Sequence, residues 1–145
     1  MIKEVFGIAG RCVSALGLLH CTRNYIIDFA ATEGASMTPA IPLEGTVVVI
    51  DKISPLLLGY SKGDIVISQS PRANHMVCKR ITGRAGDSIP VGRRKVQVPE
   101  GHVWLSGDNQ KSSVDSSTYG PVPLPLLAGK VRLTLLPLPR ILSYL

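Results

Sequence analysis

Lys79 and Ser36 are the two side chains of this sequence whose types and settings could together perform chemistry. Lys79 lies in the β-rich stretch His75–Thr82, where strand alternation places Val77, Lys79 and Ile81 on one face. An ammonium group between two branched apolar side chains is partly removed from water, and burial lowers the pKa of a lysine. A lysine that is neutral near physiological pH can act as a general base.

Ser36 is the candidate nucleophile because it lies in a turn-like run of small residues, 34–39. Gly34 permits backbone angles that other residues rarely adopt, so the turn could expose the hydroxyl and direct backbone N–H groups at an oxyanion. Taken alone, each residue has an ordinary interpretation, as a loop serine and as a surface lysine. Taken together they predict a serine protease whose base is lysine, which is a known variant of the triad.

A third element is the polar segment Ser106–Pro121, which follows the apolar strand end Val103-Trp104-Leu105. It is dense in turn formers, hydroxyls and carboxylates. A loop of this kind can place such groups at the edge of a site. The alternative is a solvated surface loop.

Composition narrows the possible partners. The 145 residues suffice for one domain, and the formal charge of +6 with only 18% charged residues describes a basic but rather apolar chain. An anionic membrane is therefore a candidate partner. Nucleic acid is not expected, because the one basic cluster, Arg93-Arg94-Lys95, is interpreted as an exposed turn and no aromatic residues are interleaved with it.

The three cysteines, Cys12, Cys21 and Cys78, have no zinc or thioredoxin spacing. Cys78 is adjacent to Lys79, but in a strand it points to the opposite face. It is therefore interpreted as a small packing residue and not as a thiol nucleophile.

The amino-terminal segment, residues 1–32, is expected to be a helix that anchors or targets the chain. Residues 5–22 are mostly apolar or small, with Arg11 inside the run and Arg23 at its end. A single weak membrane anchor, an interfacial amphipathic helix and a packed terminal helix all remain open. The segment also has the basic character of an import signal, and the cleavage site of a removable secretory signal is not evident.

Residues 33–145 are expected to form one mainly β domain without internal repeats. Short β-rich runs alternate with turn residues. Prolines make the carboxyl end extended or loop-like. The expected strands are Thr46–Asp51, Asp64–Ser68, His75–Thr82, Lys95–Val98, His102–Ser106 and Gly129–Leu135.

Four segments, in order, carry a family resemblance. They are Ser36-Met37-Thr38-Pro39, Lys62-Gly63-Asp64-Ile65-Val66, the run from Lys79 to Asp87, and the run from Gly107-Asp108-Asn109 through Ser113-Val114-Asp115-Ser116 to Gly120-Pro121-Val122. Together they resemble the sequence boxes of type I signal peptidases, the serine–lysine peptidases that include the mitochondrial inner membrane protease. The short chain, the weak anchor and the Cys-Lys-Arg junction resemble the mitochondrial branch.

The resemblance implies roles for individual residues. Ser36 matches the nucleophile, Lys79 the general base, and Ser113 a hydroxyl that orients this lysine. Asp115 matches a carboxylate that supports the site, through Arg80 or through the loop itself. The implied reaction requires no metal or cofactor.

The sequence also departs from the family pattern at three places. Gly34 stands where some bacterial relatives have an oxyanion-hole serine, so the hole would rest on backbone N–H groups, chiefly that of Ser36. Ser117 replaces the usual arginine after Asp-Ser, and Arg84-Ala85-Gly86-Asp87 replaces Leu-Pro-Gly-Asp. None of these changes touches Ser36 or Lys79.

The resemblance further implies a signal-peptidase-like β domain, similar to that of the self-cleaving repressors, behind one membrane-associated helix. The implied function is removal of sorting sequences from precursor proteins delivered to the mitochondrial intermembrane space. The implied location is the inner membrane, with the catalytic domain facing that space. Implied partners are the precursors, membrane lipid and a second catalytic subunit.

Other functions remain possible from the sequence. A bacterial-type leader peptidase would share the same residues. A histidine-based hydrolase would use His20, His75 or His102, although no Gly-x-Ser-x-Gly motif is present. A membrane-tethered β module could bind extended peptides by strand addition without catalysis.

Overall fold

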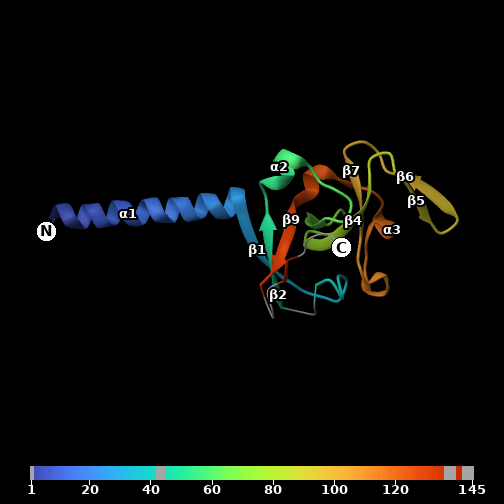
Figure 1. The fold of residues 1–145 in the computed structure, drawn as a ribbon, viewed down its shortest axis with the longest axis horizontal. Helices are drawn as coiled ribbons and strands as arrows, with labels where there is room; N and C mark the ends of the chain where they lie inside the picture. Colours follow the sequence, from blue (N-terminus) through green and yellow to red (C-terminus); the bar gives the residue numbers. More distant parts are fainter. Residues whose placement is uncertain (1, 42–44, 136–139, 142–145) are drawn as a thin grey trace.

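The computed structural model describes residues 2–41, 45–135 and 140–141. Helix α1 (Ile2–Cys21) continues into the π-helical turn η1 (Thr22–Ile26) and projects away from the β domain (Figure 1). The described side chains of α1 from residue 7 to residue 21 are exposed. The structure therefore does not support a helix packed against the domain. Among the described residues, no helix combines the length and apolarity needed to cross a membrane.

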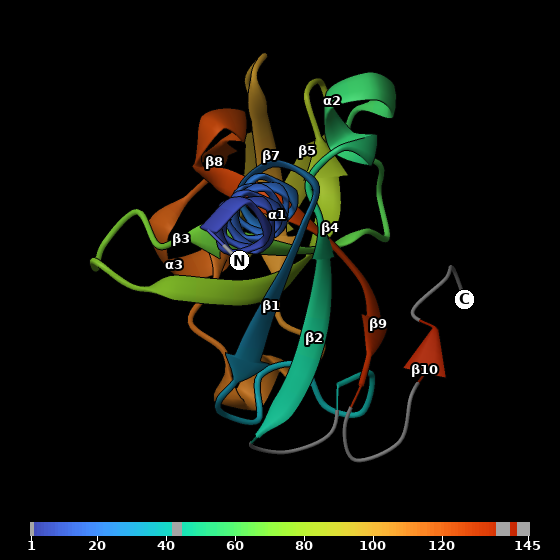
Figure 2. The same ribbon diagram turned by 90° about the vertical axis from the view of Figure 1, so that its left-hand side faces the viewer.

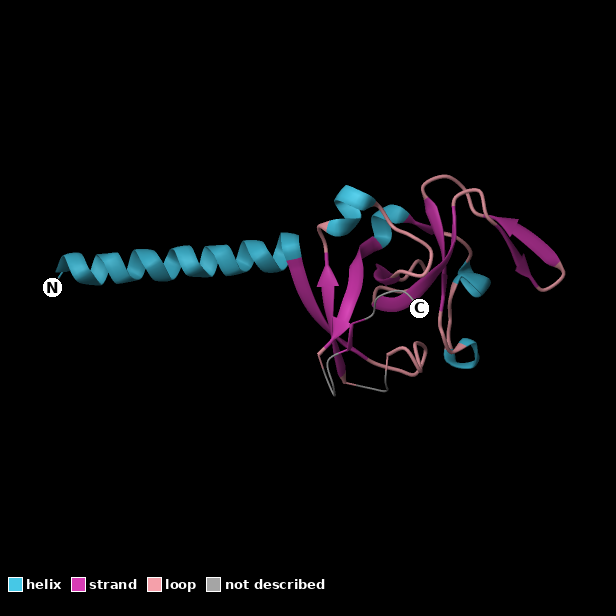
Figure 3. Cartoon of the chain, viewed as in Figure 1, coloured by secondary structure: helices cyan, strands magenta, loops and turns pink. Residues whose placement is uncertain are grey.

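The rest of the described chain is mainly β (Figure 3), which confirms the expected fold class. One antiparallel sheet has the strand order β1-β2-β9-β3-β4-β7-β8, with β10 paired to β9. Its strands are β1 (Ile27–Thr32), β2 (Thr46–Asp51), β3 (Ile65–Gln69), β4 (Met76–Arg84), β7 (His102–Ser106), β8 (Val122–Pro123), β9 (Leu127–Thr134) and β10 (Arg140–Ile141).

A separate hairpin and several short helices complete the described chain. The hairpin is β5 (Ser88–Val91) with β6 (Arg94–Gln97), and its turn exposes the basic cluster that the sequence suggested. The short helices are α2 (Ser54–Leu58), η2 (Gln110–Ser112), α3 (Ser116–Tyr119) and η3 (Leu124–Leu126).

Two hydrophobic clusters divide the core and follow the alternation of strand side chains. Ile67 of β3 belongs to a cluster with Met37, Ile41 and β2, whereas its neighbour Val66 belongs to a second cluster with Ile81. In the β3–β4 register Val66 lies opposite Lys79. Lys79 therefore shares a face with Val66 and Ile81, as the alternation of β4 predicts.

The main correction concerns residues 27–32, which were expected to belong to the amino-terminal helix. They form β1, which pairs with β2 from Ile27 opposite Asp51 to Thr32 opposite Thr46. Figure 2, viewed from the α1 end, shows the two strands side by side. The sequence Ile-Asp-Phe-Ala-Ala-Thr lacks the sustained apolar–polar alternation that would have predicted a strand. Such alternation is not needed here, because β1 adds onto the edge of β2 and none of its side chains is fully buried.

Strands β5, β8 and β10 were also not expected from the sequence. Two of them contain a proline, Pro90 in β5 and Pro123 in β8, and each of these two is an edge of its sheet. Proline is tolerated at an edge because it lacks only the outward N–H. Pro137 and Pro139 lie outside the described residues.

Candidate active site

The turn that carries Ser36 leaves β1 and is fixed by the core beneath it. Gly34 has a φ of 86°, a left-handed angle that favours glycine, so the expectation for this position holds. Beyond Ser36 the backbone N–H of Ile41 donates to the Met37 carbonyl at 2.9 Å. Met37 and Ile41 are both buried in the first cluster. The nucleophile candidate therefore lies on a turn with anchored ends and is itself half-buried.

Lys79 is buried to an extent that is unusual for lysine, with 4% of its surface exposed. Burial lowers the pKa of its amine below the ordinary value of 10.5, and the nearby charge of Asp115 opposes this shift. The lowered pKa makes the neutral amine, which can accept a proton, more available. The preceding residue, Cys78, packs against the first cluster, and burial raises the pKa of its thiol to about 12. Cys78 is therefore a poor source of thiolate, in keeping with a packing role.

Ser36 and Lys79 line the same cavity, which has a volume of about 540 Å³. Its wall also includes residues 30–32 of β1 together with Ile67, Met76 and Cys78. Most of these side chains are apolar or small. Ser36 and Lys79 therefore line one apolar cavity. The cavity lies beside β1, the strand at one edge of the sheet, where an extended peptide could bind.

The polar loop after β7 lies against the turn of Ser36. An added Cβ at Gly107 would overlap the Ser113 hydroxyl and would lie 2.7 Å from the Ser36 carbonyl oxygen. Gly107 is therefore a point of close approach between the loop and the turn that carries Ser36. The buried Ser113 hydroxyl has no partner in hydrogen-bond geometry among the described residues, although it lies near enough to Asp115 to help lower the pKa of that carboxyl.

Asp115 makes its hydrogen bonds within the loop. Its carboxylate accepts from the Gly107 N–H at 3.1 Å and from the Ser117 N–H and hydroxyl at 3.1 and 2.8 Å. Burial raises the Asp115 pKa, but these hydrogen bonds outweigh burial, so the pKa lies below 3.8. Arg80 instead forms a two-point ion pair with Asp108 at 2.8 and 2.7 Å. The hydrogen bonds of Asp115 therefore lie within the loop, and the ion pair of Arg80 is with Asp108.

Asn109 is the contact residue that sequence reasoning did not single out. Its backbone N–H donates to the Ser36 carbonyl at 2.9 Å. Its side-chain amide donates to the Ala35 carbonyl at 3.2 Å and to the Thr38 hydroxyl at 3.3 Å. The residue was visible within Gly107-Asp108-Asn109, but a one-dimensional pattern cannot show that its amide reaches a turn more than 70 positions earlier.

Replacing Asn109 with alanine is expected to lower kcat about 10- to 100-fold, because two hydrogen bonds that fix the turn of the candidate nucleophile Ser36 are lost. Asn109→Asp should be at least as harmful, since a carboxylate cannot donate to the Ala35 carbonyl. Steady-state kinetics on a cleavable presequence peptide would check this, with exposed Asn74→Ala as the matched control. A fall in peptide affinity at unchanged kcat would contradict a positioning role.

The three histidines do not form a comparable arrangement. His20 contacts Asn24 at 2.8 Å within the helix–strand junction, and a His102 ring nitrogen lies 2.9 Å from the Glu100 carbonyl. His75 lines the cavity but is exposed. Within the described part of the chain, no cluster of three or more His, Cys, Asp or Glu side chains could hold a metal ion.

Comparison with known proteins places the chain in a family. The family model described as "Signal peptidase, peptidase S26" matches residues 2–96 and 89–136. The chain is 34% identical to mitochondrial inner membrane protease subunit 1 of Xenopus tropicalis, an alignment that covers 95% of this chain and 86% of the relative. It is 40% identical to mitochondrial ATP-independent inner membrane protease subunit 1a of Arabidopsis thaliana, over 93% of this chain and 86% of the relative.

Two further matches were found, one to a protein sequence and one to a solved structure. Mitochondrial inner membrane protease subunit 2 of Schizosaccharomyces pombe is 35% identical, over 85% of this chain and 72% of the relative. A crystal structure of a signal peptidase I from Enterococcus faecalis aligns with a TM-score of 0.43 and 21% identity, over 49% of this chain and 95% of that chain. By its family match and its relatives, this chain belongs to the signal peptidase family, peptidase S26.

Proposed function

We propose that the chain cleaves peptide bonds with Ser36 as the nucleophile and Lys79 as the general base. Membership of the family makes the chain a serine peptidase; the roles of the two residues are the proposal. The observation that supports it is a lysine with 4% exposure lining the cavity that Ser36 also lines. A non-catalytic peptide-binding module would have no need of a dehydrated amine at that position.

The reaction follows from these groups. Neutral Lys79 takes the Ser36 proton as the hydroxyl oxygen attacks the peptide carbonyl, and backbone N–H groups of the turn stabilise the oxyanion. The tetrahedral adduct collapses, the C–N bond breaks, and the protonated lysine gives the proton to the leaving amine. Water then attacks the acyl-enzyme, with Lys79 as base again, and releases the acid.

Rate is expected to rise with pH through the lowered Lys79 pKa and to level off above it, because only the neutral amine accepts the proton. Asp115→Asn removes the charge that raises this pKa. The rising limb should therefore move to lower pH, although the weakened loop reduces the plateau rate. Asp108→Asn, which breaks the ion pair with Arg80, is the matched control and should leave the midpoint in place. A rate independent of pH, or an alkaline shift in Asp115→Asn, would contradict Lys79 as the base.

The substrates are proposed to be precursor proteins from which sorting sequences are removed. The relatives are named as proteases of the mitochondrial inner membrane, which supports the same membrane as the location of this chain. The amino-terminal segment is proposed as the anchor, with the β domain in the intermembrane space. Protease treatment of mitochondria tests this orientation: the tagged domain should be degraded after rupture of the outer membrane but not before. Degradation only after lysis of the inner membrane would place it on the matrix side.

A second catalytic subunit is the proposed partner. Relatives named as subunit 1 and as subunit 2 both match the chain. Its short length, weak anchor and Cys-Lys-Arg junction resemble subunit 1. Co-purification of a tagged chain with a subunit 2 relative, in detergent that preserves peptidase activity, tests this pairing. Recovery of a fully active chain without any second subunit would contradict it.

A further inference from the structure

Helix α2 presents three consecutive leucines to the outside of the domain. Leu56, Leu57 and Leu58 are 82%, 77% and 80% exposed, whereas the preceding Pro55 is buried. These three residues are called the leucine surface below. Single exposed apolar residues are normal, but a contiguous exposed group marks an interaction site.

Helix α2, which carries the leucine surface, lies at the end of the domain from which α1 departs (Figures 1 and 2). This placement follows from the register, because Asp51, the last residue of β2, lies opposite Ile27, the first residue of β1. The Asp51 carboxylate also accepts from the N–H groups of Ile53 and Ser54 at 3.0 and 2.9 Å. The start of α2 is therefore fixed beside the η1 turn at the carboxyl-terminal end of α1.

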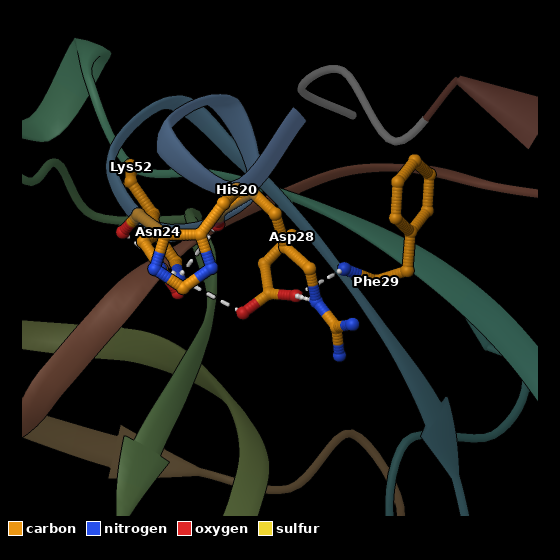
Figure 4. A network of polar contacts seen from close by, with 6 residues as sticks. His20, Asn24, Asp28, Phe29 and Lys52 are labelled. Atoms are coloured by element: carbon orange, nitrogen blue, oxygen red, sulfur yellow. Dashed lines mark hydrogen bonds and ion pairs between the residues drawn. The ribbon is translucent and has the colours of Figure 1, made fainter. Parts of the chain in front are cut away.

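A polar junction ties the η1 turn and the start of β1 to Lys52, which lies just before α2 (Figure 4). The Lys52 amine donates to the Arg23 and Asn24 carbonyls at 3.3 Å each and to the Asp28 carboxylate at 2.8 Å. The Lys52 backbone N–H donates to the Ile26 carbonyl at 3.0 Å. Lys52 thus fixes the segment before α2 against the η1 turn that continues α1, so the leucine surface and the end of α1 should meet the same surroundings.

The character of α1 indicates what those surroundings are. Its exposed large apolar residues occur at positions that, at 3.6 residues per turn, spread around the helix and not along one stripe. They are Ile8, Val13, Leu16, Leu18 and Leu19, each more than 60% exposed. A helix that is apolar on several sides fits lipid better than a protein groove. Tyr25, 71% exposed at its foot, is a residue type enriched at the membrane interface.

Charge favours an anionic lipid surface over a neutral one. The chain carries a formal charge of +6. At the junction, Arg23, whose side chain is 72% exposed, and Lys52 both pair with the single carboxylate of Asp28, so two positive charges share one negative charge. Basic groups at the boundary between an apolar segment and a folded domain attract anionic headgroups.

We propose that the leucine surface inserts into the headgroup–acyl boundary of an anionic bilayer beside α1. The domain then contacts the membrane at two rigidly joined points, which restricts its tilt and the orientation of the Ser36 cavity. This inference rests on the membrane location in the proposed function, but it does not depend on the chemistry of Ser36 and Lys79.

Fluorescence of the full chain reconstituted in vesicles of phosphatidylcholine and phosphatidylglycerol tests the proposal. The chain has one tryptophan, Trp104, which is 4% exposed and serves as an internal reference. In Leu57→Trp the introduced indole should show a blue shift. It should also lose most of its fluorescence to lipids brominated near the headgroup, while the wild-type signal is barely quenched. An indole that stays water-exposed and unquenched in these vesicles would overturn the proposal.

A set of variants separates contact with lipid from contact with a protein partner. The triple change of Leu56, Leu57 and Leu58 to serine should lower the cleavage rate in vesicles several-fold relative to its rate in detergent. The triple change to isoleucine, which keeps the surface apolar, should restore the ratio. An unchanged ratio in the serine variant, or a quenching signal that appears only when a second subunit is added, would contradict lipid as the occupant. Loss of cleavage by the wild type in detergent would instead count against the proposed function alone.

Discussion

Replacing Ser36 with alanine is expected to lower peptide cleavage about 10⁴-fold or more, the scale on which serine peptidases lose activity when the nucleophile is removed. The fold should persist, because the hydrogen bond from Asn109 and the anchors on either side of the turn involve atoms that alanine retains. Mass spectrometry of a presequence peptide after incubation with each variant gives the measurement. Ser88→Ala, at an exposed position of β5, is the matched control and should cleave normally.

The same experiment separates a peptidase from a peptide-binding module. Wild type and Ser36→Ala should bind the peptide with similar affinity, since the cavity wall is unchanged, while only the wild type produces fragments. Equal binding with no cleavage by either protein would favour the binding module. Residual cleavage by Ser36→Ala near the wild-type rate would require another nucleophile.

Replacing Lys79 with arginine is expected to abolish turnover, because a guanidinium stays protonated in proteins and cannot accept the Ser36 proton. Arginine is also bulkier than lysine, so Lys79→Met provides a variant of similar length without a charge. It should be equally inactive. Its free energy of unfolding should equal or exceed that of the wild type, because an amine with 4% exposure is costly to keep charged.

A stability measurement and a control variant complete the lysine experiment. Thermal unfolding monitored by circular dichroism should show Lys79→Met folded, so its inactivity would reflect loss of the base. Lys95→Arg, at an exposed position of the β5–β6 hairpin, should behave as wild type. Activity retained in Lys79→Met would move the base to another residue.

The burial of Lys79 could be predicted from the sequence, because successive side chains of a strand point to opposite faces of the sheet. Val77, Lys79 and Ile81 fall on one face whatever the partner strand, and β4 has this pattern, with Lys79 and Ile81 buried. The unusual backbone conformation of Gly34 was also predictable, because a left-handed φ is a local property that favours glycine. The resemblance to signal peptidases added the family, which the comparisons confirm.

Features that depend on contacts between distant segments could not be predicted. Asp108 and Asp115 lie in one loop and are chemically alike, so only the structure shows that Arg80 pairs with Asp108. The amide of Asn109 reaches across the chain to Ala35 and Thr38. The exposure of the leucine surface was equally hidden, because an apolar triplet in a sequence suggests burial.

Catalysis as proposed requires that burial leave Lys79 able to accept a proton from Ser36. The most direct test is a titration of the Lys79 amine by NMR in the full chain, ¹⁵N-labelled at lysine side chains and assigned by comparison with Lys79→Arg. We expect the pKa of this amine to lie well below the ordinary lysine value of 10.5. A Lys79 amine that remains cationic up to that value would contradict its role as the base.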